Sequence, residues 1–304
     1  MKVNLIDIDL KYRASSSRGE IFPNLALMKL SAYEKSQGNL TGFNMQNPNR
    51  TYISCVFTKN RLNTIKECCD TFDTDRTFGG SGLSMDFILP PEIEDIKPDY
   101  DLYPSTYSMG FTTRGCIRNC GFCLVRQKEG YFRRSQHIKE FHDFRFDSCK
   151  LLDNNILADK EWFFENTNWA IDNSVKLNIT QGMDIRLVTQ EIAHQLARIK
   201  FVDQQIRFAW DNCEDEQKIR DGIRRLKTAG INTRRNVSFY VLSNYNTAIE
   251  MDIYRCETLK KLMCNSFVMM YLETPRHKEL ARWANRRPLY WTVDFEQYEN
   301  RRKK

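Results

Sequence analysis

From about residue 106 onward, short apolar runs alternate with longer amphipathic stretches, and no other feature constrains the fold as strongly. Short apolar runs are typical of buried strands, whereas apolar residues recurring about every three to four positions indicate helices. The predicted strands are residues 108–112, 148–152, 176–180, 205–210, 238–242 and 267–272. The helices predicted between and after them are residues 160–171, 190–199, 216–229, 248–264 and 276–285. This order predicts an α/β fold, a partial (β/α)6 TIM-like barrel whose chemistry lies where strands end and loops begin.

Residues 1–105 show a shorter version of the same pattern. Strands are predicted at residues 3–8, 52–57 and 76–78, with helices at 25–36 and 62–72. This order predicts a small Rossmann-like α/β domain. A glycine turn at residues 79–82 and the prolines after it indicate an extended connection to the barrel. We therefore divide the chain into a domain at residues 1–105 and a barrel with a C-terminal extension at residues 106–304.

Composition and charge favour a reducing, aqueous compartment. No apolar run approaches the ~20 residues needed to cross a bilayer. Asp7 and Asp9 interrupt the first apolar stretch, which indicates a first strand and not a signal peptide. We expect a cytoplasmic protein without a membrane partner, whose ten cysteines stay reduced and become candidates for metal binding or catalysis. The net charge of +7 is typical of a solubilising surface, with a nucleic-acid partner as the less favoured interpretation.

Three cysteines follow the first predicted barrel strand within eight residues, namely Cys116, Cys120 and Cys123. Glycines in this segment, Gly115 and Gly121, let the backbone pass close to a bound group. Thiolates are the soft ligands that iron–sulfur clusters require, and three of them leave one iron of a four-iron cluster open. The alternatives are a zinc knuckle, or three unrelated buried thiols. The fourth zinc ligand would then be Cys149, His137 or His142.

The C-x3-C-x2-C spacing, with aromatic Phe122 before the last cysteine, resembles the signature of the radical S-adenosylmethionine superfamily. The resemblance covers about residues 106–280. It implies a [4Fe–4S] cluster whose open iron chelates S-adenosylmethionine, and an external one-electron donor of the flavodoxin or ferredoxin kind. Reductive cleavage would then give a 5′-deoxyadenosyl radical that abstracts hydrogen from a substrate. The resemblance names neither that substrate nor a catalytic residue.

Polar residues follow the predicted strands and are candidate ligands of S-adenosylmethionine, because the carboxyl ends of barrel strands converge. They are Asp153, Asn154, Asn155, Gln181, Asp184, Arg186, Asp211 and Asn244. The first three stand where the family's segment receives the amino group, and their oxygens can accept from an ammonium. Arg186 can bind the methionine carboxylate or pair with Asp184. Helix capping and Asx turns are the structural alternative for each.

The first 105 residues also resemble a shortened cobalamin-binding domain. The Asp-x-His-x-x-Gly motif of an axial histidine is absent, because Asp9 is followed by Leu10 and Lys11 and the first histidine is His137. Histidine ligation from this domain is therefore excluded, and cobalamin is the less favoured option. We expect a degenerate domain that packs on the barrel or shapes substrate access. A lone Gly-Gly-x-Gly turn carries little weight as a nucleotide cradle.

The expected activity is radical chemistry on an unidentified substrate, which the positive charge weakly favours as anionic. One alternative is a cobalamin-dependent radical methyltransferase. Another is a non-catalytic metal-binding protein that binds nucleic acid with salt-dependent affinity. The other cysteines form no second compact triad, so we expect no auxiliary cluster.

Overall fold

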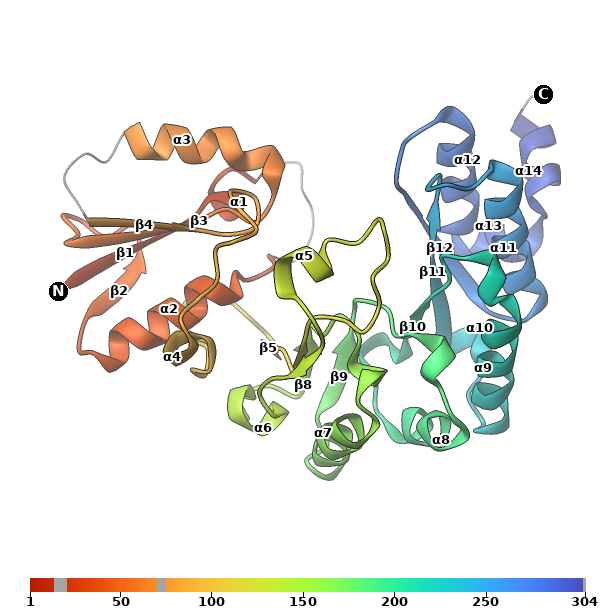
Figure 1. Ribbon diagram of the computed structural model, residues 1–304, viewed down its shortest axis with the longest axis horizontal. Helices are drawn as coiled ribbons and strands as arrows, with labels where there is room; N and C mark the ends of the chain where they lie inside the picture. Colours follow the sequence, from red (N-terminus) through yellow and green to blue (C-terminus); the bar gives the residue numbers. More distant parts are fainter. Residues whose placement is uncertain (14–20, 70–74, 303–304) are drawn as a thin grey trace. The chain divides into compact units, whose positions relative to one another are not determined.

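The computed structural model describes residues 1–13, 21–69 and 75–302 (Figure 1). The chain forms two compact units. The first comprises Met1–Gly110 and Lys139–Phe146, and the second comprises Phe111–Ile138 and Asp147–Lys304. The prediction of an α/β protein with parallel sheets is confirmed. Within the described ranges, no helix is long and apolar enough to cross a membrane.

The first unit is built on a parallel sheet in the order β2-β1-β3-β4. Its strands are β1 (Lys2–Asp7), β2 (Leu40–Phe43), β3 (Arg50–Ser54) and β4 (Asp75–Gly79). The helices are α1 (Ile8–Lys11), α2 (Leu25–Ser36), α3 (Arg61–Cys69) and α4 (Pro91–Glu94). β1 is buried along nearly its whole length, as expected for a central parallel strand covered on both faces. Leu5 packs with Leu27 on one face, and Ile6 packs with Ile53 on the other.

The second unit contains five parallel strands. They are β8 (Ser148–Leu151), β9 (Lys176–Ile179), β10 (Ile206–Ala209), β11 (Val237–Ser243) and β12 (Asn265–Met270). β8 pairs with β9, and β10 pairs with β11, which pairs with β12. Between these two groups, the backbone N–H of Met183 donates to the carbonyl of Arg207 at 2.8 Å and forms a parallel bridge opposite Phe208. The wall of strands therefore continues across β9 and β10 through this bridge.

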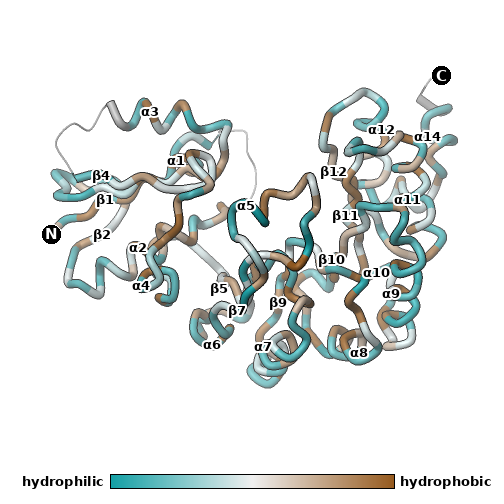
Figure 2. Tube along the Cα trace, viewed as in Figure 1, coloured by the Kyte–Doolittle hydropathy of each residue, from teal (hydrophilic) through white to brown (hydrophobic). Residues whose placement is uncertain are grey.

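Helices cover one face of these strands (Figure 1). They are α7 (Lys160–Asp172), α8 (Gln190–Arg198), α9 (Glu216–Thr228), α10 (Thr233–Asn236), α11 (Ile249–Lys261) and α12 (Pro275–Ala284), and α13 (Arg287–Thr292) and α14 (Phe295–Arg302) pack on α12. Along β11, Val237, Phe239 and Val241 are fully buried, whereas Ser238 and Tyr240 are half-buried. Side chains alternate across a strand, so the first set faces the helices and the second faces away. In Figure 2, β11 is coloured mostly as apolar, whereas α9 on the outside is mostly hydrophilic.

Shorter elements lie before β8. They are β5 (Ser108–Gly110), the antiparallel pair β6 (Thr113–Arg114) and β7 (Arg133–Arg134), α5 (Val125–Glu129) and α6 (Ile138–Phe141). Most predicted bounds lie within two residues of the observed ones, and three differ by more. β3 begins at Arg50 and ends at Ser54, because the following backbone N–H groups donate to Asp9 instead of a strand. Helix α11 ends at Lys261, because Met263 adopts φ 59° and reverses the chain without a glycine. The predicted helix 62–72 is described to Cys69, and its last residues lie outside the described ranges.

Candidate functional site

The cysteine loop runs from β6 to α5 and carries Cys116, Cys120 and Cys123 as free, half-buried thiols. The N–H of Cys123 donates to the carbonyl of Cys120 at 3.0 Å, which makes the loop turn tightly. Burial raises the pKa of the Cys120 thiol, and the negative charges of Cys123, Asp211 and Cys116 raise it further. Cys116, Cys123 and Asp211 therefore each lie within electrostatic reach of Cys120. A cation placed among these thiols would reverse this effect and favour thiolates.

The loop depends on Gly115, which adopts φ +70°. A Cβ atom there would lie 2.2 Å from the carbonyl oxygen of Tyr131. Gly121 lies against Tyr245, because its Cβ would lie 2.6 Å from the tyrosine hydroxyl oxygen. The ring of Phe122 meets the Tyr245 ring edge to face, with centroids 5.3 Å apart. Gly115 therefore lets the loop pack against the segment that follows it, at Tyr131. Gly121 and Phe122 let it pack against Tyr245, in the segment after β11.

Substituting Gly115 with alanine is expected to reduce the iron retained per chain after anaerobic reconstitution. The φ +70° backbone adds strain of about 1–3 kcal/mol for a non-glycine residue, and the new methyl group meets the Tyr131 carbonyl. Gly230→Ala is the control, since Gly230 follows α9 outside the cysteine loop and adopts φ +85° with no atom within 4 Å of its Cβ position. Equal loss of iron in both variants would show that the Tyr131 contact is irrelevant.

Asp153, at the end of β8, is fully buried and anchors the start of the cysteine loop. Its carboxylate accepts hydrogen bonds from the hydroxyl and backbone N–H groups of both Thr112 and Thr113. Burial raises the pKa of Asp153, and these four donors oppose the rise. The two neighbouring asparagines are different. Asn154 Nδ2 and Asn155 Oδ1 are buried without a hydrogen-bond partner in the described part of the chain, and Asn155 Nδ2 faces Cys116 Sγ at 3.8 Å.

The segment after β9 joins the cysteine loop through ion pairs. Asp184 accepts from Arg118 of the cysteine loop at 2.9 Å and from Arg186 at 2.7 and 3.0 Å. The guanidinium of Arg186 also donates to Asp215 at 2.6 Å. Arg186 is therefore held between two carboxylates, which is the structural alternative given for it above. Gln181 is exposed at the same strand end.

Burial acts to raise the pKa of Asp184, but the hydrogen bonds and charges of Arg186 and Arg118 outweigh it and lower the pKa below its ordinary value. A carboxyl group with a lowered folded-state pKa stabilises the fold above its unfolded pKa of about 3.9 and loses this contribution as the pH falls below it. Asp184→Asn should therefore reduce the unfolding free energy of the cluster-free protein at neutral pH by about 1–3 kcal/mol.

The measurement is urea unfolding of wild type and Asp184→Asn between pH 3 and pH 7, a range of about one unit below to three units above the unfolded pKa. The difference between them should be constant above about pH 5 and should shrink below about pH 4. Asp203→Asn is the control, because Asp203 is exposed and has no salt bridge among the residues described. A difference independent of pH would contradict the ion-pair explanation.

Asp211 and Asn244 follow β10 and β11. Asp211 is mostly buried, accepts the Leu242 N–H at 3.1 Å, and has a pKa raised by burial. Asn244 adopts φ +61°, and its side chain donates to the carbonyl of Leu272 at 2.9 Å. Asp211 therefore lies near the thiols, whereas the Asn244 side chain ties the loop after β11 to that after β12.

Beneath these strand ends lies a buried ion pair that the sequence analysis missed. Arg255 and Asp252 of α11 have fully buried side chains joined at 2.6 Å. Arg255 also donates to the carbonyls of Trp210 and Leu242, at 2.8 and 2.7 Å. Asp252 accepts the backbone N–H of Asn244 at 2.9 Å. The pair thus fixes the ends of β10 and β11. In sequence, two opposite charges three residues apart on a helix are typical of an exposed surface pair.

Three other cysteines of the second unit are buried, and His137 packs among aromatic rings. Cys149, Cys256 and Cys264 are buried, and burial raises the pKa of each, to about 12 for Cys256 and Cys264. The His137 ring packs edge to face against two tryptophans, Trp162 and Trp169. His142 lies in the first unit. Nothing in the structure describes the side chains of Cys68 and Cys69.

No group of three or more His, Cys, Asp or Glu side chains in the described ranges is arranged to hold one metal ion. Three free thiols on one loop are soft donors of the kind that an iron–sulfur cluster requires, and the zinc knuckle stays the alternative. The N–H of Arg118, at 3.3 Å, and the Asn155 amide both point at Cys116 Sγ.

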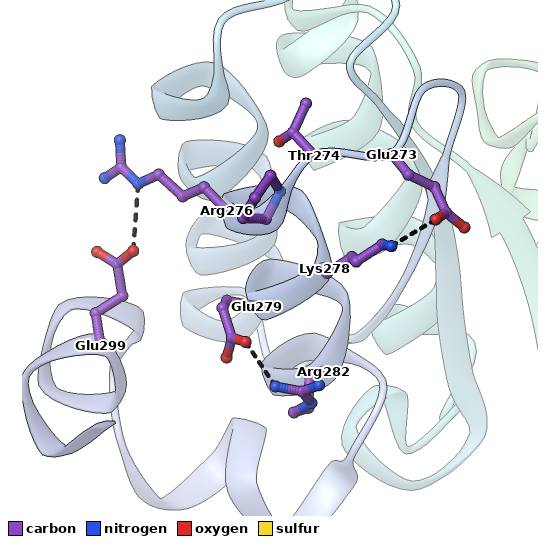
Figure 3. A pocket seen from close by; sticks show the side chains of 8 residues that line it. Glu273, Thr274, Arg276, Lys278, Glu279, Arg282 and Glu299 are labelled. Atoms are coloured by element: carbon purple, nitrogen blue, oxygen red, sulfur yellow. Dashed lines mark hydrogen bonds and ion pairs between the residues drawn. The ribbon is translucent and has the colours of Figure 1, made fainter. Parts of the chain in front are cut away.

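The described part of the second unit carries two surface pockets. One lies along α12, where Lys278 pairs with Glu273, Arg282 with Glu279, and Arg276 with Glu299 (Figure 3). Its charges neutralise one another, and it is remote in sequence from the cysteine loop. The other is shallow and lies at the strand ends, lined by residues 244–248 with Tyr271 and Leu272. Only the second pocket adjoins the segments that meet the cysteine loop, through Tyr245.

Neither a protein-family model nor a curated protein sequence matches this chain. Among solved structures, the fold matches that of TsrM from Kitasatospora setae, a radical S-adenosylmethionine methyltransferase solved with cobalamin and a [4Fe–4S] cluster bound. The TM-score is 0.65, and the match covers 92% of this chain and 78% of that one at 10% sequence identity. The fold is therefore one that a radical S-adenosylmethionine methyltransferase also adopts.

Proposed function

We propose that this protein is a radical S-adenosylmethionine enzyme whose [4Fe–4S] cluster is held by Cys116, Cys120 and Cys123. The observation that carries the proposal is the convergence of the cysteine loop with polar groups from the ends of successive parallel strands. Asn155 follows β8, Asp184 follows β9, and both contact this loop. The likeness to a cluster-binding methyltransferase supports the same conclusion at the level of the fold. On this reading β8 to β12 belong to the wall of a partial (β/α)6 barrel within residues 106–304.

When bound, the cluster supplies the electron that cleaves the sulfonium of S-adenosylmethionine. The chain's own groups tune and position it. The N–H of Arg118 and the amide of Asn155 donate toward the Cys116 sulfur, and such hydrogen bonds adjust a cluster's reduction potential. Asp153 holds the start of the loop through Thr112 and Thr113, so the thiols are fixed relative to β8. An external one-electron donor of the flavodoxin or ferredoxin kind completes the proposal.

The unpaired polar atoms beside the thiols are proposed to bind S-adenosylmethionine. Asn155 Oδ1 can accept from an ammonium group, and Asn154 Nδ2 can donate to a carboxylate. Asp211, Gln181 and Asn244 are proposed to contact the nucleoside part. Asp153, Asp184 and Arg186 are assigned to positioning, because their hydrogen-bonding atoms are occupied by neighbouring residues.

Cobalamin-dependent methyl transfer is the second candidate, favoured by the methyltransferase neighbour, which was solved with cobalamin. The glycine turn of the first unit does not fit a nucleotide cradle. A Cβ on Gly80 would lie 2.2 Å from the Cys55 carbonyl oxygen, and one on Gly82 would lie 2.8 Å from the Phe57 carbonyl carbon. Internal packing thus already requires these glycines. Asp9 stands where the axial-histidine motif would begin, but no histidine follows it, and its carboxylate accepts the backbone N–H of Val56 at 2.6 Å. We therefore propose residues 1–105 to be a degenerate cobalamin-binding-like domain.

Product analysis tests the two candidates on one preparation. Protein purified and reconstituted without oxygen is incubated with S-adenosylmethionine and dithionite, and the products are separated by liquid chromatography with mass spectrometry. Release of 5′-deoxyadenosine without S-adenosylhomocysteine supports radical cleavage alone. Formation of S-adenosylhomocysteine with retained cobalamin supports methyl transfer, and a radical methyl transfer gives both products, because one S-adenosylmethionine supplies the methyl group and another supplies the radical. Stoichiometric zinc without iron, or a loaded cluster that yields neither product, overturns the enzymatic proposal.

A further inference from the structure

One face of strands β10 to β12 carries large side chains that stay partly exposed among the residues that the structure describes. Val241 and Val268 are buried on the face where α11 and α12 pack. By alternation, Phe267 and Met269 project from the opposite face, where they remain 44% and 41% exposed. Figure 1 shows α11 and α12 on one side of these strands. This side of β10 to β12, with Arg207, Tyr240, Phe267 and Met269, is the open face.

The apolar part of the open face is held rigidly. Tyr240 lies directly opposite Phe267 in register, and their rings meet edge to face with centroids 5.9 Å apart. The Tyr240 hydroxyl donates to the carbonyl of Thr180 at 2.9 Å, so the ring leans across β10 toward the end of β9. Gly182 permits this, because a Cβ there would lie 2.8 Å from the ring. The result is a fixed wall of two aromatic rings beside Met269.

A cation lies next to this wall. Arg207 projects from β10 on the open face and is half-buried. Its guanidinium makes one long hydrogen bond, to Asn178 Oδ1 at 3.4 Å, and no salt bridge joins it to an acid within the described residues. Its charge reaches the hydroxyl of Tyr240, where it opposes the rise in pKa that burial causes. A guanidinium has five donors, so most of those on Arg207 are available to a ligand.

We propose that the open face binds the substrate, and that this substrate is a small molecule with a flat apolar body and one anionic group. The body would lie on Tyr240, Phe267 and Met269, and the anion would pair with Arg207. A planar guanidinium binds carboxylate and phosphate alike in a bidentate manner. This inference rests on the proposed function, because it takes the reaction to occur beside this face of the strands.

Two fluorescent probes of matched shape test the inference on cluster-reconstituted protein. One is 8-anilinonaphthalene-1-sulfonate, and the other is N-phenyl-1-naphthylamine, which has the same aromatic body without the sulfonate. Arg207→Gln should weaken sulfonate binding about tenfold or more, as loss of a charge-assisted contact does, and leave the neutral probe unchanged. Phe267→Ala should weaken both probes. Arg224→Gln, an exposed arginine on α9, should affect neither.

Arg207→Lys keeps the charge and should retain part of the sulfonate affinity, which separates loss of charge from loss of fold. Equal weakening of both probes in Arg207→Gln, or no change in either, overturns the inference. A parallel loss of S-adenosylmethionine affinity, measured by equilibrium dialysis, also overturns it, because Arg207 would then serve the cofactor. Wild-type 5′-deoxyadenosine release is measured on the same preparations. If no 5′-deoxyadenosine is released but Arg207→Gln still weakens only the sulfonate probe, the proposed reaction is wrong and the binding site remains supported.

Discussion

Substitution of Cys120 with alanine is expected to abolish both the bound cluster and the release of 5′-deoxyadenosine. Changes to residues that only support a metal ligand cost about 10–100-fold in affinity or activity, so losing a direct ligand should cost more than about 100-fold. Cys120 is half-buried and lies electrostatically close to the other two thiols and to Asp211. The measurements are iron and acid-labile sulfide per chain, and 5′-deoxyadenosine formed in the presence of dithionite.

Cys213→Ala is the matched control for this prediction. Cys213 is also a free, half-buried thiol and follows the end of β10, but it lies outside the cysteine loop. It should keep wild-type iron and wild-type product. If both variants lose iron equally, the assignment of the cluster to the loop is wrong. If Cys120→Ala retains its iron, the ligand set itself is wrong.

Substitution of Arg255 with methionine is expected to lower the unfolding free energy by about 3–5 kcal/mol, because it leaves the Asp252 carboxylate buried without its partner. The side chains of both residues are fully buried. The variant also removes the donors to the carbonyls of Trp210 and Leu242. Urea unfolding of the cluster-free protein gives the change.

The double variant Arg255→Met with Asp252→Leu should be less destabilised than Arg255→Met alone, since no uncompensated charge remains. Arg276→Met is the surface control. Arg276 pairs with Glu250 while 47% of its side chain is exposed, and such pairs contribute about 0–1 kcal/mol. A loss for Arg255→Met no larger than for Arg276→Met would contradict the positioning role of the buried pair.

Local sequence patterns predicted helices and strands well where buried residues recur at a regular spacing. The predicted helix 25–36 coincides with α2, which begins after the capping side chain of Asn24. β2 was missed because Leu40–Phe43 is only partly buried and contains a glycine, so no alternating signal marks it. Its pairing with β1, far away in the chain, makes it a strand. Such long-range pairing leaves no trace in local periodicity.

The candidate site, too, could be predicted from the sequence only in part. The cysteine loop and the polar strand ends could be predicted, because spacing and position carry that information. The use of each polar group could not, since it depends on residues distant in sequence. The Asp153 carboxylate already accepts hydrogen bonds from Thr112 and Thr113. The Arg186 guanidinium donates to Asp215, which lies on another loop. Only the folded chain separates these positioning groups from the unpaired Asn154 and Asn155.

The unpaired side-chain atoms of Asn154 and Asn155 connect the free energy of folding with the affinity for a ligand. Removing a polar atom from water without giving it a partner costs about 1–3 kcal/mol. Asn154 Nδ2 and Asn155 Oδ1 have lost their water by the time the chain is folded. A ligand that pairs with them therefore meets no further dehydration cost on the protein side. The stability that these unpaired atoms cost the fold therefore returns in part as tighter binding of a ligand that pairs with them.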